Sequence, residues 1–511
     1  MSTLGKRQRL DETENDKALS SPLQKNRRLD AGHDRKSPWQ LTWIRDLPEE
    51  LNKDAVTLHD ILGDALISEC WEFNFLHDID FLMDAFDSDI RHLVDVHVVH
   101  GFWKREDPQR MALSLAASAY DNVKLHVAPM PEMFGTHHSK MMILFRHDDT
   151  AEVVIHTANM IAKDWTNMTN AVWRSPRLPS RAAEGSQMSS SYEDLAIGSG
   201  DRFKADLLSY LRCYDCRVLT CKPLADKLSR YDFSAVRAAL VASAPGVHDG
   251  HDLSNTPFGW SAMKRYLKAV PCQAGSAEVV VQISSIATLG GKDGWLQETL
   301  FDALSSGQRR GQRPRFKIVF PTADEVRRSL DGYASGGSIH TRIQSAQQAQ
   351  QMKYLQPILY HWANDCDDGA GLPSGIAVQN SGRNRAAPHI KTYIRYNENQ
   401  TLDWALLTSA NLSKQAWGGA AKPTGQVRIA SWEVGVLIWP ELLQPDAPSM
   451  IGTFQSDSPG PLDPAAEPNA VPVAVRIPYS LPLQQYGTGE VPWVASMAHS
   501  EPDCHGQVWA I

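Results

Sequence analysis

Two distant segments of the chain each carry a histidine and a lysine two positions apart: His138 with Lys140, and His389 with Lys391. Each pair opens an apolar, β-rich run, and residues i and i+2 of a strand project from the same face. Each pair is therefore expected to present an imidazole and an ammonium side by side. One His-x-Lys alone would mean little, because a single histidine is more often structural than catalytic.

The similarity between the two segments, called the sequence echo below, extends beyond the His and Lys residues. The first copy continues to His-Thr-Ala-Asn159 and the second to Thr-Ser-Ala-Asn411, so the His-to-Asn spacings are 21 and 22 residues. A β-hairpin that returns after about twenty residues brings its last residue back beside its first. The copies lie 251 residues apart, about half the chain. This predicts two similar halves, related by a pseudo-two-fold, whose groups merge into one composite site.

Two imidazoles, two ammoniums and two amides suit phosphoryl transfer. A neutral histidine can attack phosphorus and hold it covalently. A second histidine, with a pKa near ~6.5, can protonate the leaving oxygen and later deprotonate water. Lysine and asparagine can stabilise charge on the non-bridging oxygens, as a divalent metal does elsewhere. No Asp/Glu-rich ligand cluster accompanies the motifs, so we expect no metal and no other cofactor. The spacing alone leaves open which histidine attacks.

Composition narrows the class of protein. The 511 residues include 51 Lys+Arg and 59 Asp+Glu, a formal charge of −8, which disfavours a protein that coats nucleic acid through bulk positive charge. No apolar run approaches the ~18–20 residues that span a bilayer, and no apolar signal peptide opens the chain. Seven cysteines, an odd and sparse number, favour a reducing compartment. We therefore expect a soluble intracellular protein of several domains, with no membrane partner.

Helical and strand patterns alternate along the chain, which predicts an α/β fold of packed layers. Residues 1–38 are polar and charged and are expected to be a disordered tail. Its basic clusters, KRQR at 6–9 and KNRR at 25–28, suggest a nuclear-import signal. We expect one domain at 39–250 and a second at 251–511. The proline-rich residues 440–482 are expected to be an irregular surface excursion of the second domain.

The paired motifs resemble the phospholipase D superfamily. There an Asp usually follows four residues after the motif, but here Phe145 and Tyr396 stand at that position. A distant Asn in place of the Asp resembles the tyrosyl-DNA phosphodiesterase family. The matching segments, which span roughly residues 40–511, are FGTHHSKMM from Phe134, HTANMI, HIKTY, TSANLSKQAWG, SWEVGVL, VPW and the closing HGQVW.

The resemblance implies a DNA-repair hydrolase built of two phospholipase D-like α-β-α sandwich halves. It implies that His138 is the nucleophile and that His389 is the general acid and then the base. Lys140, Lys391, Asn159 and Asn411 would bind the phosphate in the transition state. Glu433 matches an acidic residue expected to support the second histidine. Asn170 stands where relatives have a Gln expected to support the first histidine.

The resemblance also implies the partners. These are 3′ ends of DNA, single-stranded or frayed, joined to a topoisomerase-derived peptide through a phosphotyrosyl bond whose hydrolysis leaves a 3′-phosphate. Phe134 would stack on DNA. Small hydroxyl residues would hold DNA phosphates: Ser284, Ser285, Thr288, Ser338 and Ser413. The opposite, peptide-side groove would be lined by Phe75, His340 and Trp493. We expect a nuclear monomer.

Two other interpretations compete with this one. The chain could be a phospholipase or nuclease of the same superfamily, but the missing motif Asp residues argue against that. It could also be a catalytically inactive scaffold that binds nucleic acid or peptide. The complete set of both His, both Lys and both Asn argues against that reading.

Overall fold

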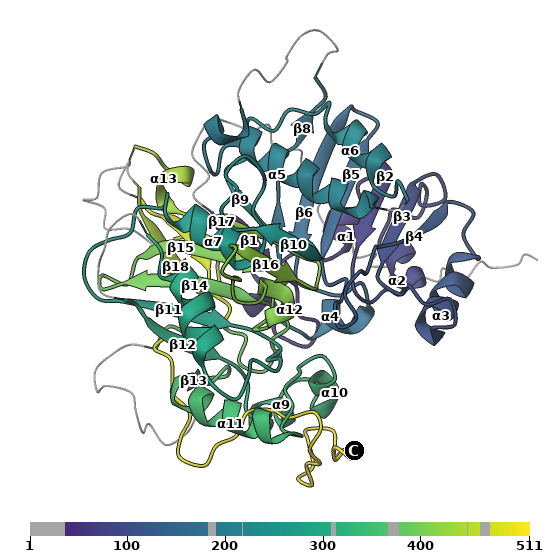
Figure 1. Ribbon diagram of the computed structural model, residues 1–511. Helices are drawn as coiled ribbons and strands as arrows, with labels where there is room; N and C mark the ends of the chain where they lie inside the picture. Colours follow the sequence, from purple (N-terminus) through teal and green to yellow (C-terminus); the bar gives the residue numbers. More distant parts are fainter. Residues whose placement is uncertain are drawn as a thin grey trace, which may run out of the picture. The chain divides into compact units, whose positions relative to one another are not determined.

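Two sheets with the same strand order form the centre of the molecule (Figure 1). The first runs β1-β7-β6-β5-β2-β3-β4, with β8 beside β6, and the second runs β9-β17-β15-β14-β11-β12-β13. The parallel and antiparallel pairings match at each position, for example β2 with β3 and β11 with β12, both parallel. The sequence echo is therefore a repeat of the whole sheet, as a pseudo-two-fold requires.

The strands have the following bounds. The first sheet contains β1 (Trp39–Leu41), β2 (Ile67–Phe73), β3 (Asp95–His100), β4 (Val123–Val127), β5 (Met141–Arg146), β6 (Thr150–His156), β7 (Ala171–Arg174) and β8 (Leu178–Pro179). The second contains β9 (Ala239–Ser243), β11 (Ala277–Gln282), β12 (Arg315–Val319), β13 (Leu359–Tyr360), β14 (Thr392–Asn397), β15 (Leu402–Thr408) and β17 (Glu433–Ile438).

The structure is a computed structural model that describes residues 36–181, 191–216, 218–307, 313–365, 378–446, 448–459 and 471–510. They belong to one compact unit, Arg35–Ile511. The predicted tail, with both basic clusters, lies outside the described residues except at its end. There Ser37 donates its backbone N–H to the Asp457 carbonyl and its hydroxyl to the Trp39 carbonyl. Packed structure thus begins slightly before the predicted boundary at residue 39.

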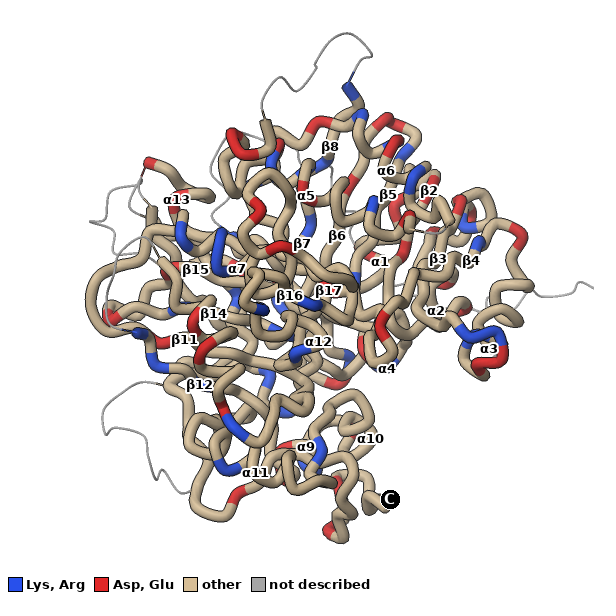
Figure 2. Tube along the Cα trace, in the orientation of Figure 1, with Lys and Arg blue, Asp and Glu red and all other residues tan. Residues whose placement is uncertain are grey.

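Charge is dispersed along the described chain. Figure 2 shows Lys and Arg interleaved with Asp and Glu along the trace, in keeping with the formal charge of −8. Within the described residues, no helix combines the length and the apolar character that crossing a membrane would require.

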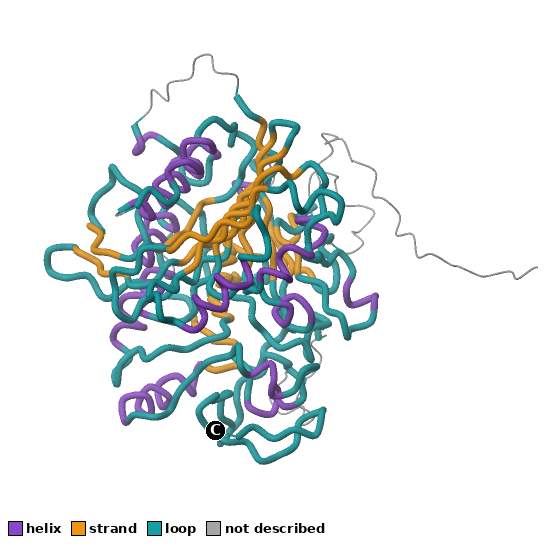
Figure 3. The backbone as a smooth tube through the Cα atoms, turned by 90° about the vertical axis from the view of Figure 1, so that its right-hand side faces the viewer, coloured by secondary structure: helices purple, strands orange, loops and turns teal. Residues whose placement is uncertain are grey.

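Helices cover the sheets on both sides (Figure 3). One face of the first sheet packs on α1 (His59–Leu62), α2 (Ile79–Asp84) and α3 (Pro108–Ala117). One face of the second packs on α7 (Gly259–Leu267), α8 (Phe301–Leu304) and α11 (Ala346–Leu355). The remaining faces of both sheets share one core with α5 (Gly200–Arg212) and α6 (Lys222–Leu228). Because both faces are buried, the central strands carry apolar side chains on both faces instead of alternating apolar and polar residues.

The two motif hairpins keep their register despite their unequal lengths. β5 pairs with β6 without interruption, whereas the β14–β15 ladder shifts register between Arg395 and Tyr396. That irregularity absorbs the extra residue of the second copy. The following contact is then the same in both halves: the N–H of His156 donates to the Lys140 carbonyl, and that of Thr408 to the Lys391 carbonyl, each at 3.1 Å.

The predicted boundary between the two domains is wrong. The division at residue 250 fails because β9 already belongs to the second sheet, paired with β17. The predicted division also cuts directly behind β10 (Gly246–Asp249), which pairs with β16 (Gln426–Ile429). The pairing partners lie more than 170 residues ahead in the chain, so local composition could not reveal them.

The proline-rich segment is not merely a surface excursion. It contains α13 (Pro440–Leu443) and the parallel pair β18 (Met450–Thr453) and β19 (Val473–Arg476). Met450 and Val475 are fully buried in the shared core. Prolines break periodicity without preventing burial, which is why the pattern misled. Residues 447 and 460–470 of this segment lie outside the described part of the chain.

Candidate active site

The two hairpins deliver their chemistry to a common cavity of about 330 Å³. His138 lies just before β5 and Asn159 just after β6, while His389 and Asn411 take the same places around β14 and β15. All four line the cavity, together with residues from both halves. The predicted composite site is therefore present in the fold.

Both motif lysines lie behind the histidines and are fully buried. Lys140 donates from Nζ to the backbone carbonyl of His138 at 3.2 Å. Lys391 makes the equivalent bond to the carbonyl of His389. The i, i+2 arrangement thus places each ammonium beside its own histidine, as the motif predicts.

Each histidine is supported by a residue from the other half. Isolated bridges pair His137 with Trp432, and Thr169 with Pro388. The next residues along these segments therefore face each other: Nδ1 of His138 bonds Oε2 of Glu433 at 2.9 Å. The expectation that Glu433 supports the second histidine is wrong. The pseudo-two-fold places each supporting residue against the histidine of the other half, and the linear sequence does not show this relation.

Asn170 correspondingly serves His389, not His138. Its Oδ1 lies 3.2 Å from Nδ1 of His389. Each support is held by the hydroxyl residue two positions before the motif Asn: Thr157 donates to Asn170 at 2.8 Å, and Ser409 donates to Glu433 at 2.5 Å. These hydroxyls stand in the sequence echo, but their role depends on the crossed pairing.

Burial dominates the electrostatics of the site. It lowers the pKa of His138 to about 4, against the opposing influence of Glu433, and lowers that of Lys140 to about 8. The pKa values of His389 and Lys391 also fall well below their usual ranges, first through burial and then through neighbouring cations. Burial favours a raised pKa for Glu433, but the facing His138 holds it below its usual value. A phosphate bound in the cavity would supply negative charge, which raises the pKa of each of these histidines and lysines.

Most of the predicted DNA-side residues surround the cavity. Phe134 is 77% exposed at its rim, where a ring is free to stack on a base. The backbone N–H groups of Ser284 and Ser285 donate to Oδ1 of Asn411 at 3.0 and 2.9 Å. Ser338 and Ser413 also line the cavity.

Thr288 is the exception on that side. It is exposed but does not line the cavity, and its hydroxyl accepts a hydrogen bond from Gln348 instead. The neighbouring Ala287 reaches the cavity in its place.

The predicted peptide-side residues divide. Phe75 and His340 line the cavity, and the Phe75 ring centroid lies 5.7 Å from that of His138. Trp493 does not line it: the side chain is fully buried. Its indole N–H donates to the carbonyls of Gly336 and Ile339, so it anchors the loop that carries His340. Trp493 packs in the interior because burial covers its large apolar ring there and its indole N–H finds carbonyl acceptors.

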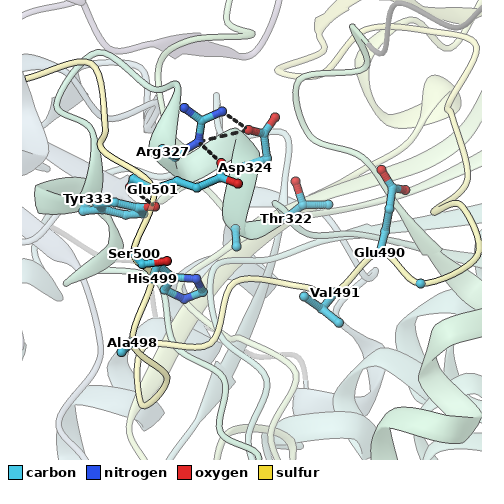
Figure 4. A pocket seen from close by; sticks show the side chains of 12 residues that line it. Thr322, Asp324, Arg327, Tyr333, Glu490, Val491, Ala498, His499, Ser500 and Glu501 are labelled. Atoms are coloured by element: carbon cyan, nitrogen blue, oxygen red, sulfur yellow. Dashed lines mark hydrogen bonds and ion pairs between the residues drawn. The ribbon is translucent and has the colours of Figure 1, made fainter. Parts of the chain in front are cut away.

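A hollow elsewhere, of about 390 Å³, lies between α9 (Ala323–Arg327) and the C-terminal segment (Figure 4). It contains none of the motif residues. Its charged groups pair with one another, Arg327 with both Asp324 and Glu501. This hollow is larger than the cavity at the motifs, but it lacks the paired histidines and asparagines.

Sequence reasoning missed Asp164 on α4 (Ala162–Thr166). Its Oδ2 accepts from the backbone and side-chain nitrogens of Asn159 at 2.8 and 2.9 Å, and lies 3.2 Å from Nδ1 of His389. The second copy has no matching carboxylate, so the repeat gave no signal for it. Among the described residues, no group of three or more His, Cys, Asp or Glu side chains is arranged to hold a metal ion.

A family model described as tyrosyl-DNA phosphodiesterase matches residues 38–487. The chain belongs to the tyrosyl-DNA phosphodiesterase family. It is 31% identical to the probable tyrosyl-DNA phosphodiesterase of Schizosaccharomyces pombe, over 93% of this chain and 95% of that one. It is 30% identical to tyrosyl-DNA phosphodiesterase 1 of Arabidopsis thaliana, over 93% of this chain and 76% of that one.

The fold agrees with that of a tyrosyl-DNA phosphodiesterase. A crystal structure of the yeast enzyme superimposes with a TM-score of 0.63 at 21% identity, covering 90% of this chain and 99% of that one. The predicted α/β class with two similar halves is confirmed. The chain is thus a hydrolase of the phosphodiesterase kind.

Proposed function

We propose that this tyrosyl-DNA phosphodiesterase family member hydrolyses the bond between a DNA 3′-phosphate and the tyrosine of a topoisomerase-derived peptide. The observation that carries the proposal is the facing pair of supported histidines over two buried lysines. The exposed Phe134 and the half-buried Phe75 both line the cavity, and we expect them to contact different substituents of one phosphate.

In the first step, His138 attacks phosphorus through Nε2. Glu433 accepts the Nδ1–H of His138, which leaves the Nε2 lone pair free. The pKa of about 4 keeps this imidazole neutral at pH 7. A P–N bond forms and the P–O bond to tyrosine breaks, while the Nε2–H of His389 protonates the leaving phenolate.

In the second step, His389 takes a proton from water, whose oxygen attacks phosphorus. The P–N bond breaks, which restores His138 and leaves a 3′-phosphate on the DNA. Lys140 and Lys391 stabilise the added negative charge in both transition states. These ammoniums supply the electrostatic work, so the proposed reaction runs without a metal or other cofactor.

The negative charge of the bound phosphodiester also determines whether His389, the proposed general acid, is protonated. Burial, followed by the charges of Lys391, Lys140 and His138, holds the pKa of His389 down. A bound phosphate neutralises part of that positive charge and raises the pKa. His389 therefore gains the proton that it needs as a general acid when the substrate binds. A phenol, with a pKa near ~10, leaves more easily than an alkoxide, so such a site favours the tyrosyl bond.

The partners proposed are single-stranded or frayed 3′ ends of DNA. Stacking on Phe134 and hydrogen bonds from small residues tolerate any base sequence. We also propose that the chain acts as a monomer, since both histidines and their supports come from one polypeptide. Sedimentation of the purified chain at working concentrations checks this, and an obligate dimer would contradict it.

Nuclear localisation is proposed from KRQR at 6–9 and KNRR at 25–28, which lie outside the described residues. Replacing the basic residues of both clusters with Ala in the full chain should leave a fluorescent fusion in the cytoplasm. Unchanged nuclear accumulation would reject the clusters as the signal.

The activity is tested with a 3′-phosphotyrosyl oligonucleotide in excess EDTA. We expect wild type to release tyrosine and leave a 3′-phosphate, and expect H138A and H389A to lose this activity. No product, or a requirement for a divalent ion, would overturn the proposal.

A further inference from the structure

The buried carboxyl group of Asp164 touches the second histidine without belonging to either sequence motif. Asp164 is fully buried, and its Oδ2 lies 3.2 Å from Nδ1 of His389. The same oxygen accepts two hydrogen bonds from Asn159, which holds the carboxyl group in place. The other oxygen, Oδ1, is buried and has no hydrogen-bond partner among the described residues. A buried carboxyl group held beside an imidazole is an arrangement that tunes a general acid.

The neighbouring Asn170 does not replace this carboxylate. Its Oδ1 also lies 3.2 Å from Nδ1 of His389, but it already accepts from Thr157 at 2.8 Å. An amide oxygen carries no net charge and stabilises an imidazolium less than a carboxylate does. Asn170 therefore fixes the orientation of the His389 ring, while Asp164 supplies a negative charge beside Nδ1.

The two halves differ at this position. Trp165 follows Asn159 by six residues, and Trp417 follows Asn411 by six, so Asp164 corresponds to Ala416. His138 receives its carboxylate from Glu433, the two-fold equivalent of Asn170. Each histidine thus has one carboxylate at Nδ1, but the two come from non-equivalent places in the fold.

We propose that Asp164 is a positioning residue for the acid–base histidine: its carboxylate, 3.2 Å from Nδ1 of His389, stabilises the imidazolium that protonates the leaving group. This inference rests on the proposed function. The proton moves only between Nε2 of His389 and the tyrosyl oxygen or water, and Asp164 keeps its charge.

Several charged groups act on this pair. Burial raises the pKa of Asp164, while Lys391, Lys140 and Lys163 oppose that rise. Burial lowers the pKa of His389, and the facing Lys391, Lys140, His138 and His340 lower it further. A carboxylate at Nδ1 is the opposing influence that keeps an imidazolium accessible in this cationic cavity.

The test compares two leaving groups on the same oligonucleotide. A 3′-phosphotyrosyl bond needs the acid, whereas a 3′-(4-nitrophenyl) phosphate releases a much more acidic phenol and needs it little. In single-turnover assays, D164N should slow tyrosine release by about 10²-fold. It should slow nitrophenol release by less than about 3-fold, since a good leaving group departs without a proton.

D206N is the matched control. Asp206 is also fully buried and accepts hydrogen bonds from Tyr192, Thr256 and Tyr266, but it does not line the cavity. We expect D206N to change both rates by the same factor. Equal slowing of both substrates by D164N, or no slowing of either, would overturn the inference. Failure of wild type on both substrates would instead reject the proposed function.

A readout without substitution guards against misfolding of D164N. Spectra of ¹⁵N-histidine-labelled wild type should show His389 at neutral pH as the tautomer protonated on Nδ1. The tautomer protonated only on Nε2 would overturn the inference, because an unprotonated Nδ1 would then face the carboxylate of Asp164.

Discussion

His138 and Glu433, 295 residues apart in the chain, are joined by a 2.9 Å hydrogen bond across the two halves. The bond lies directly beside the bridge between His137 and Trp432. The nucleophile proposed for one half therefore depends on a carboxylate from the other. Neither half carries a complete site, so the two sheets must associate before the chemistry is possible.

Replacing Glu433 with Gln should slow cleavage of the phosphotyrosyl bond by about 10²- to 10⁴-fold. The amide keeps the volume but removes the negative charge that orients His138. Single-turnover rates on the 3′-phosphotyrosyl oligonucleotide measure the effect. E278Q, in a partly exposed ion-pair cluster with Arg315 and Lys317, is the control and should retain wild-type rates. A rate for E433Q within about 3-fold of wild type would contradict the crossed support.

A weakened acid–base histidine should trap the covalent intermediate. With H389N, hydrolysis of the P–N bond lacks its base, so a labelled oligonucleotide should migrate with the protein on denaturing gels. The double variant H138A/H389N should show no such band. If the band persists without His138, another residue is the nucleophile.

The value of kcat/KM should fall at alkaline pH, because the two lysine ammoniums lose their protons at a lower pH than usual. The pKa of Lys140 is lowered to about 8, and that of Lys391 is also lowered. Their charged forms, which bind phosphate, are present below these values and are lost as pH rises. We expect kcat/KM to decline from about pH 8 or lower, while kcat holds to higher pH because bound phosphate raises the lysine pKa values. Constant kcat/KM up to pH 10, in protein shown by circular dichroism to stay folded, would refute this.

Substitutions of Phe134 and Trp493 should affect different properties: the first should weaken DNA binding and the second should lower stability. F134A removes an exposed ring, so the free energy of unfolding should change by less than about 0.5 kcal/mol. Affinity for single-stranded DNA should fall by about 1–3 kcal/mol through lost stacking. W493A empties a fully buried site and should cost about 3–5 kcal/mol of stability. Urea unfolding and fluorescence anisotropy separate the two, and a stable W493A would contradict the anchoring role.

The sequence by itself determined the chemical groups and the hairpins. His138, Lys140 and Asn159 lie in one local motif, and strand periodicity with a short return was enough to place them together. The repeat at His389, Lys391 and Asn411 likewise predicted two similar halves with one site. These inferences succeeded because the contacts they need are close in the chain.

Only the tertiary structure decided which half supports which histidine. Glu433 and Asn170 exchange partners because a two-fold relation places each support opposite the other half's motif. Asp164 escaped notice because its symmetry mate is Ala416, and Trp493 was misplaced because its burial depends on a loop more than 150 residues away. Local patterns fix which groups a strand presents, but long-range packing fixes what those groups meet.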